Sequence, residues 1–152
     1  MAGVNRTGVM AGGLTAGVIL VASGLGLGLF VILPEARPLI AEGYSPSPAI
    51  PLLFRLGLGF VLVWAYAGLR PRYGVGARSV LAAALTVWAA ATVGVVSIAS
   101  MFPTLSPLTA ALVVVWGLIE CVGAGLAGAA IYRRLAAARA RRRGKSVGEP
   151  VV

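Results

Sequence analysis

Four long apolar stretches constrain this chain more than any other feature of its sequence. They run from about residue 8 to 33, 50 to 69, 79 to 101 and 107 to 132. Each is about 20 residues or longer, enough for a helix to cross a hydrocarbon core of about 30 Å. Because 59% of the 152 residues are hydrophobic and only 11% are charged, a soluble domain could not bury this surface. The stretches are too long for barrel strands, so we predict an all-α integral membrane protein, a four-helix transmembrane bundle.

The basic residues indicate how the four helices are oriented. Eleven of the 13 Lys and Arg residues lie before the first stretch, between the second and third, or after the fourth, and Arg37 alone lies in the opposite connectors. Because Lys and Arg are enriched in cytoplasmic loops, we expect both termini to be cytoplasmic. The arginines expected to contact anionic lipid headgroups of the inner leaflet are Arg70, Arg72, Arg78, Arg133, Arg134, Arg139, Arg141, Arg142 and Arg143.

The connectors divide the chain into a transmembrane domain, residues 1–132, and a basic cytoplasmic tail, residues 133–152. Residues 34–49 contain four prolines and are predicted to form a loop, because proline removes a hydrogen-bond donor and fixes φ. In the next connector, Pro71 is expected to break the helix. The first stretch is too long for a cleaved signal peptide, although Arg6 before it keeps that alternative open. The last helix is expected to continue to about residue 140, with disorder from Val147 onward.

Small residues recur at helical spacing in the first and last stretches. In the first they are Gly13, Gly17, Gly24 and Gly28, and in the last Gly117, Gly123, Ala124, Ala127 and Gly128. Such a face lets two backbones approach closely, which adds dispersion contacts that lipid cannot replace. We expect these faces to pack the chain's own bundle. A face left for a homo-oligomer or a membrane partner subunit stays open as the alternative.

Two charged residues lie inside the apolar stretches. Glu120 is predicted near the membrane midplane, on the small-residue face, where a carboxylate needs a partner or water. Its roles stay open: a structural group with or without Arg55, a proton or cation site for transport, or a contact with a partner. Counted along the helices from the outer face of the membrane, Arg55 is predicted to lie roughly 12 Å less deep than Glu120. We therefore expect Arg55 to reach the outer headgroups rather than to pair with Glu120.

Several classes of chemistry are excluded by residues that the sequence lacks. It has no His and no Asp, which removes His-ligated haem, His metal sites and Ser-His-Asp triads. A single cysteine, Cys121, provides no redox pair and is expected to be a small buried residue.

The basic tail lacks interleaved aromatic residues, so we do not expect nucleic acid as a partner. Trp88 and Trp116 are expected to pack in the core. We expect no enzyme, no cofactor and no metal.

Two segments resemble a known group of proteins. One is Trp64–Gly76, in which a tyrosine precedes an Arg-Pro-Arg-aromatic-Gly turn, and the other is Trp116–Glu120 with the small-residue run and Tyr132 after it. Together they resemble a broad group of small bacterial four-span inner-membrane proteins. The resemblance covers all four stretches. It implies the fold and the location, directs interest to Glu120 and the turn, and implies no activity.

The leading hypothesis for function is a small multi-pass membrane protein without catalytic activity, a structural or accessory component that acts through helix packing. The many small-residue faces support it. The alternative is a small transporter or channel that uses Glu120 as an intramembrane proton or ion site. Small multidrug transporters carry their glutamate in the first span, and four-span quinone reductases need cysteine pairs, so neither pattern matches.

Overall fold

The computed structural model describes residues 5–43, 47, 49–99 and 106–147, and the secondary structure of this part of the chain is entirely helical. The elements are α1 (Arg6–Leu27), a π-helical segment (Gly28–Ile32), α2 (Leu33–Ala41), α3 (Ala49–Tyr73), α4 (Ala77–Ala99) and α5 (Pro107–Val147). The prediction of an all-α chain is confirmed. Three helical stretches are long and apolar enough to cross a membrane: Arg6–Pro38, Ala49–Tyr73 and Pro107–Arg141. In α4 the described apolar part is Ala77–Thr92; the side chains of residues 93–99, and residues 100–101 of the predicted third span, lie outside the described residues.

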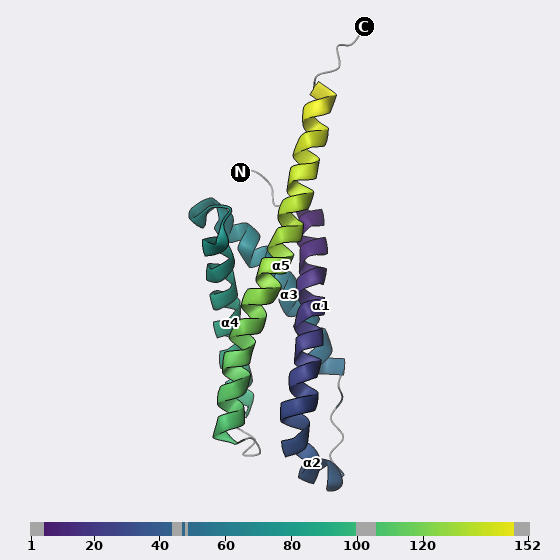
Figure 1. Ribbon diagram of the computed structural model, residues 1–152, viewed down its shortest axis with the longest axis vertical. Helices are drawn as coiled ribbons and strands as arrows, with labels where there is room; N and C mark the ends of the chain where they lie inside the picture. Colours follow the sequence, from purple (N-terminus) through teal and green to yellow (C-terminus); the bar gives the residue numbers. More distant parts are fainter. Residues whose placement is uncertain (1–4, 44–46, 48, 100–105, 148–152) are drawn as a thin grey trace.

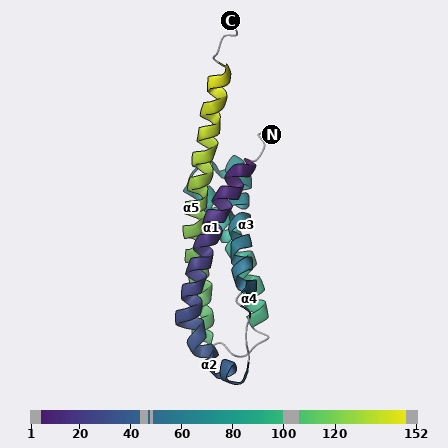
Figure 2. The ribbon, with the colours of Figure 1, turned by 90° about the vertical axis from the view of Figure 1, so that its right-hand side faces the viewer.

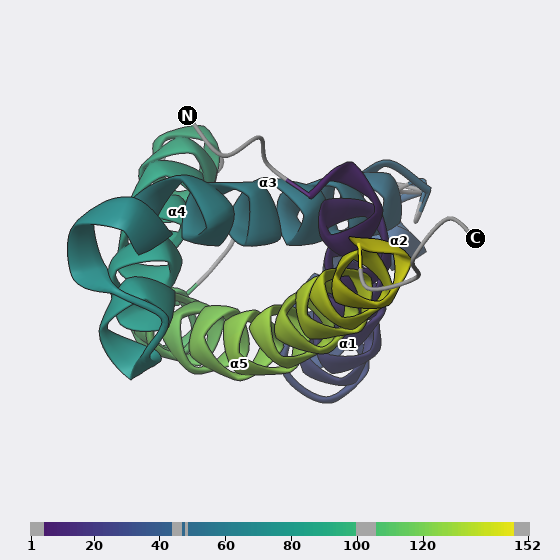
Figure 3. The same ribbon diagram turned by 90° about the horizontal axis from the view of Figure 1, so that it is seen from above.

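The four long helices run up and down alternately along one axis (Figures 1 and 2). α1 packs against α3 and α5, and α4 packs against the same two helices. Seen along the axis, α1 and α4 lie at opposite ends of the arrangement (Figure 3). α5 extends well beyond the other helices, at the end where both chain termini lie (Figure 1). One continuous helix therefore carries the last apolar stretch and the basic tail as far as Val147, and residues 148–152 lie outside the described residues.

Glycines bring the backbone of α1 against α3 and α5. A Cβ added to Gly59 of α3 would lie 2.7 Å from the carbonyl oxygen of Gly13, and one added to Gly17 would lie 2.8 Å from that of Leu56. A Cβ on Gly12 would lie 2.6 Å from the carbonyl oxygen of Gly128 in α5. These positions have no room for a side chain, so close backbone approach holds the three helices together.

The remaining predicted packing positions divide into two groups. A Cβ added to Gly24 would overlap Arg55, and one added to Gly117 would be in ordinary contact with Trp88. Ala124 is fully buried, and Ala127 is half-buried. A Cβ on Gly28 or Gly123, however, would meet nothing within 4 Å among the described residues, so these two glycines do not pack the chain's own bundle, and packing against another helix stays a prediction for them. Gly123 is exposed because the buried face of α5 is centred nearer Cys121, which is buried as expected.

Prolines interrupt the helices less than predicted. Residues 33–41 form α2 instead of a loop, because the helix continues from α1 through the π-helical segment, where the N–H of Leu33 bonds to the carbonyl oxygen of Gly28, and Pro34 follows this wider turn. α3 continues through Pro71 to Tyr73, because Pro71 lies in the last turn and few later hydrogen bonds depend on it. The reversal follows at Gly74, whose φ of 81° suits glycine. Residues 44–46 and 48 of the predicted loop lie outside the described residues.

Candidate functional site

The two charged residues of the apolar stretches form an ion pair between α3 and α5. Arg55 Nη1 lies 2.7 Å from Glu120 Oε2, and the side chains are 24% and 4% exposed. The same nitrogen donates a hydrogen bond to the backbone carbonyl oxygen of Leu20 in α1, at 3.0 Å. The guanidinium therefore joins three helices. The expectation that Arg55 would reach the headgroups instead of pairing is wrong.

The position of α3 explains why the pair forms. α3 begins farther from the α2 end of the molecule than α5 does, so Arg55 lies deeper than counting residues from a common surface suggested (Figures 1 and 2). Gly24 of α1 provides the space for the guanidinium, since a Cβ there would lie 2.5 Å from Arg55 Nη1. A glycine at this position is thus part of the charged site.

The second carboxylate oxygen of Glu120 has its own donor. Trp116, one turn earlier on α5, donates from Nε1 to Glu120 Oε1 at 2.9 Å, and the same nitrogen lies 3.0 Å from Ser23 Oγ in α1. The expectation that Trp116 packs in the core is wrong, because its side chain is 42% exposed and only its N–H points to the site. The four-residue spacing of Trp116 and Glu120 was the sequence signal for this contact. Trp88 instead donates to the carbonyl oxygen of Val114, at 3.0 Å.

This arrangement neutralises charge rather than exposing it. Glu120 receives a hydrogen bond from the charged guanidinium of Arg55 on one oxygen and one from the uncharged indole N–H of Trp116 on the other. In surroundings of low dielectric constant, each charge needs the other, because an unpaired buried charge is costly. Within the described residues, no group of three or more His, Cys, Asp and Glu side chains is placed to hold a metal ion.

A second polar cluster lies where α2 meets the start of α5, and the sequence reasoning missed it. Glu35 Oε1 accepts hydrogen bonds from Ser106 Oγ at 2.9 Å and from Thr109 Oγ1 at 2.5 Å. Ser106 Oγ also accepts from the backbone N–H of Thr109, at 3.2 Å, and so caps α5. A carboxylate at a helix N-terminus is favourable. The sequence signal was a serine before Pro107, which is a typical helix start.

At the opposite end of the molecule, three of the arginines predicted to contact headgroups also contact protein; one of them, Arg72, lies over the ring of its neighbour Tyr73, with Cζ 5.7 Å from the centroid. Arg70 lies over Tyr132, with Cζ 5.3 Å from the ring centroid, and Tyr132 packs edge-to-face on Tyr66 at 5.9 Å. Arg139 donates to the side chains of Asn5 and Thr7 in the first turn of the chain's described part. Among the arginines predicted to contact headgroups, Arg72, Arg78, Arg133, Arg134 and Arg141 are exposed to solvent or lipid. The side chains of Arg142 and Arg143 lie outside the described residues.

Comparisons of this chain with protein-family models, with curated proteins and with solved structures find no match in any of the three.

Proposed function

We propose that this chain is a four-span protein of a bacterial inner membrane, with both termini cytoplasmic, that acts without catalysis as a structural or accessory component through helix packing. One observation carries the proposal: the two charges inside the apolar helices satisfy each other. Glu120 is held by Arg55 and Trp116 through both of its carboxylate oxygens. Its charge is thus neutralised within the chain instead of being left for a substrate.

The distribution of basic residues supports the proposed orientation. The start of α1, the turn between α3 and α4 and the extension of α5 lie at the same end of the molecule (Figure 1). These segments carry Arg6, Arg72, Arg78 and the arginines of the tail, whereas Arg37 lies in α2 at the other end. An excess of Lys and Arg on one side is typical of the cytoplasmic side.

The outer face of α5 is the surface through which we expect the protein to act. Gly123 is exposed there, and its helical neighbours Ile119 and Leu126 are 60% and 46% exposed. An exposed glycine between aliphatic side chains lets another transmembrane helix approach closely. The glycines that face inward, such as Gly128, are already used by the chain's own packing.

Substitution of the exposed glycine tests this proposal. The protein is reconstituted in lipid nanodiscs, and its association with itself or with a co-purified partner is measured by cross-linking and mass. We expect Gly123→Leu to weaken association while the helix content is unchanged, because a Cβ at this position meets nothing within 4 Å. Gly57→Leu, at an equally open site on α3, is the matched control. A strictly monomeric wild-type protein without any partner would contradict the proposal.

The alternative is a small transporter or channel in which Glu120 binds a proton or a cation. The exposure of the Arg55 side chain, 24%, is the observation that favours it, because a pair with one accessible member can open without unfolding the bundle. Proteoliposomes with wild-type protein or Glu120→Gln distinguish the two. Proton or cation flux that the variant loses would support the alternative, and equal flux in both would remove Glu120 from the mechanism.

A further inference from the structure

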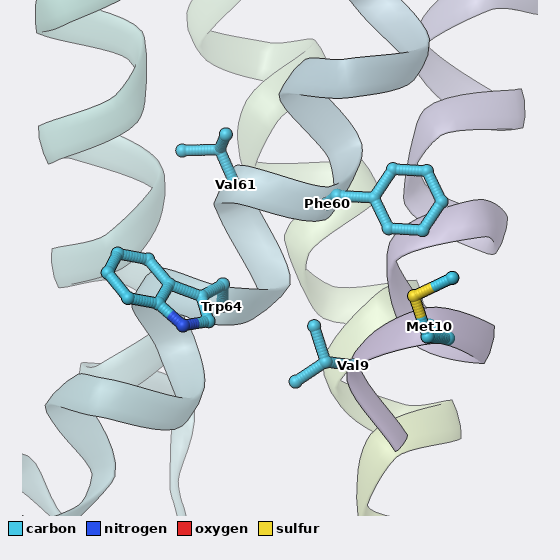
Figure 4. Close-up of a pocket in the computed structure, with 5 residues that line it drawn as sticks. All are labelled: Val9, Met10, Phe60, Val61 and Trp64. Carbon is cyan, nitrogen blue, oxygen red and sulfur yellow. The ribbon is translucent and has the colours of Figure 1, made fainter. Parts of the chain in front are cut away.

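An open apolar depression lies on the outside of the α1–α3 pair. Val9 and Met10 of α1 line it together with Phe60, Val61 and Trp64 of α3 (Figure 4). Met10 is 62% and Trp64 is 65% exposed, so the depression opens outward, away from the core. All five side chains are apolar apart from the indole nitrogen. In a membrane, such a surface is filled by hydrocarbon, because water would find no hydrogen-bonding partners in it.

Two arginines lie on the same faces of these helices, nearer to the end that carries the termini. Arg6 precedes Met10 by four residues, which is one helical turn, or about 6 Å along the axis. Arg72 follows Trp64 by eight residues, about 12 Å along α3, and lies about 80° around the helix from it, at the edge of the same face. Both arginines are exposed. The helices thus place positive charge at headgroup depth above an apolar hollow.

We infer that the depression and these two arginines form a binding site for one anionic phospholipid of the inner leaflet. An acyl chain lies against Met10, Phe60 and Trp64, and the headgroup phosphate lies near Arg6 and Arg72. This inference rests on the membrane placement proposed above. Charge complementarity selects the lipid, since Arg binds phosphate strongly and each basic residue adds affinity for an anionic leaflet.

Charge also argues against a second copy of the chain at this surface. Copies inserted with the same orientation place their basic ends at the same depth. A neighbour seated on the depression would therefore bring its own arginines close to Arg6 and Arg72, with repulsion between like charges. An anionic lipid meets the same surface with attraction at the headgroup and apolar contact below it.

Trp64 provides the reporter for the test. The protein is reconstituted in nanodiscs of unlabelled phosphatidylcholine that contain a small fraction of lipid brominated on the acyl chains, either phosphatidylglycerol or phosphatidylcholine. Bromine quenches tryptophan fluorescence on contact, and subtracting the signal of Trp64→Phe isolates this residue from Trp88 and Trp116. Since Trp64 is mostly exposed, phenylalanine is accommodated without repacking.

We expect quenching of Trp64 to be about threefold or more stronger with the brominated anionic lipid than with the brominated zwitterionic one. The double variant Arg6→Gln/Arg72→Gln is expected to bring this ratio close to one. The matched control Arg78→Gln/Arg133→Gln removes two exposed arginines from the same end of the molecule, on α4 and α5, and should keep the ratio.

Four results would overturn the inference in different ways. Equal quenching by the two lipids in the wild-type protein leaves the membrane placement intact and removes the site. Equal loss of the ratio in both double variants shows general attraction to the leaflet in place of a site. Absence of quenching by either lipid contradicts both the site and the membrane placement. Weak quenching by both lipids, together with cross-links between copies at Met10 or Trp64 rather than on the outer face of α5, shows a second copy on the depression and also overturns the inference.

Discussion

Replacing Arg55 by methionine removes the guanidinium charge and keeps an unbranched side chain. The change leaves Glu120, whose side chain is 4% exposed, with Trp116 as its remaining donor. Breaking a buried pair in this way is expected to cost about 3–5 kcal/mol of unfolding free energy, because the other charge stays buried without compensation. Glu120→Met is expected to cost less, about 2–3 kcal/mol, because the more exposed Arg55 can turn its charge outward.

Replacing both residues removes both charges together. The variant Arg55→Met/Glu120→Met is therefore expected to lie within about 1 kcal/mol of the wild-type protein, which gives a coupling energy of at least about 4 kcal/mol in the double-mutant cycle. Unfolding by sodium dodecyl sulfate in mixed micelles measures the four free energies. Arg37→Met, an exposed arginine outside the pair, is the control and should change stability by less than about 0.5 kcal/mol. Additive single effects, with no coupling, would refute the reasoning.

Three further changes probe the packing around the site. Gly24→Ala is expected to displace the guanidinium of Arg55 and so to lower the unfolding free energy of the wild-type protein. In the double methionine variant the same substitution should have little effect. An equal loss of unfolding free energy in both backgrounds would contradict this account of the contact. Gly59→Ala is expected to cost about 2–3 kcal/mol in the same unfolding assay, because α1 and α3 must separate, whereas Gly57→Ala at an open site should be neutral or slightly stabilising. Glu35→Gln is expected to speed hydrogen exchange of the first amides of α5, and unchanged exchange would show that the cluster does not hold the helix start.

The helical architecture could be predicted from the sequence because lipid leaves few alternatives. A stretch of about 20 apolar residues must satisfy its own backbone hydrogen bonds, and a helix is the solution available to a single segment. The ends of the helices were less predictable. Pro71 was interpreted as a helix breaker, but it lies in the last turn of α3, and the prolines of residues 34–41 follow a π-helical segment through which the helix continues.

The ion pair could not be predicted by counting residues along the chain. Counting assumes that every helix begins at the same depth, and the later start of α3 along the bundle axis removes the expected gap between Arg55 and Glu120 (Figure 1). The rotation of α5 toward Cys121 also depends on packing against α1 and α3, which the periodicity of one helix does not reveal. Local signals were nevertheless present: Trp116 lies one turn before the carboxylate, and Gly24 is in the predicted small-residue set.

The central claim is that Glu120 and Arg55 neutralise each other as a fixed pair inside the apolar helices. Difference infrared spectroscopy of the wild-type protein against Glu120→Gln, in lipid at neutral pH, observes the carboxyl group itself. The account predicts an ionised carboxylate band for Glu120 that persists in Gly57→Ala and shifts in Arg55→Met. A band of a protonated carboxyl in the wild-type protein, unchanged when Arg55 is replaced, would contradict it.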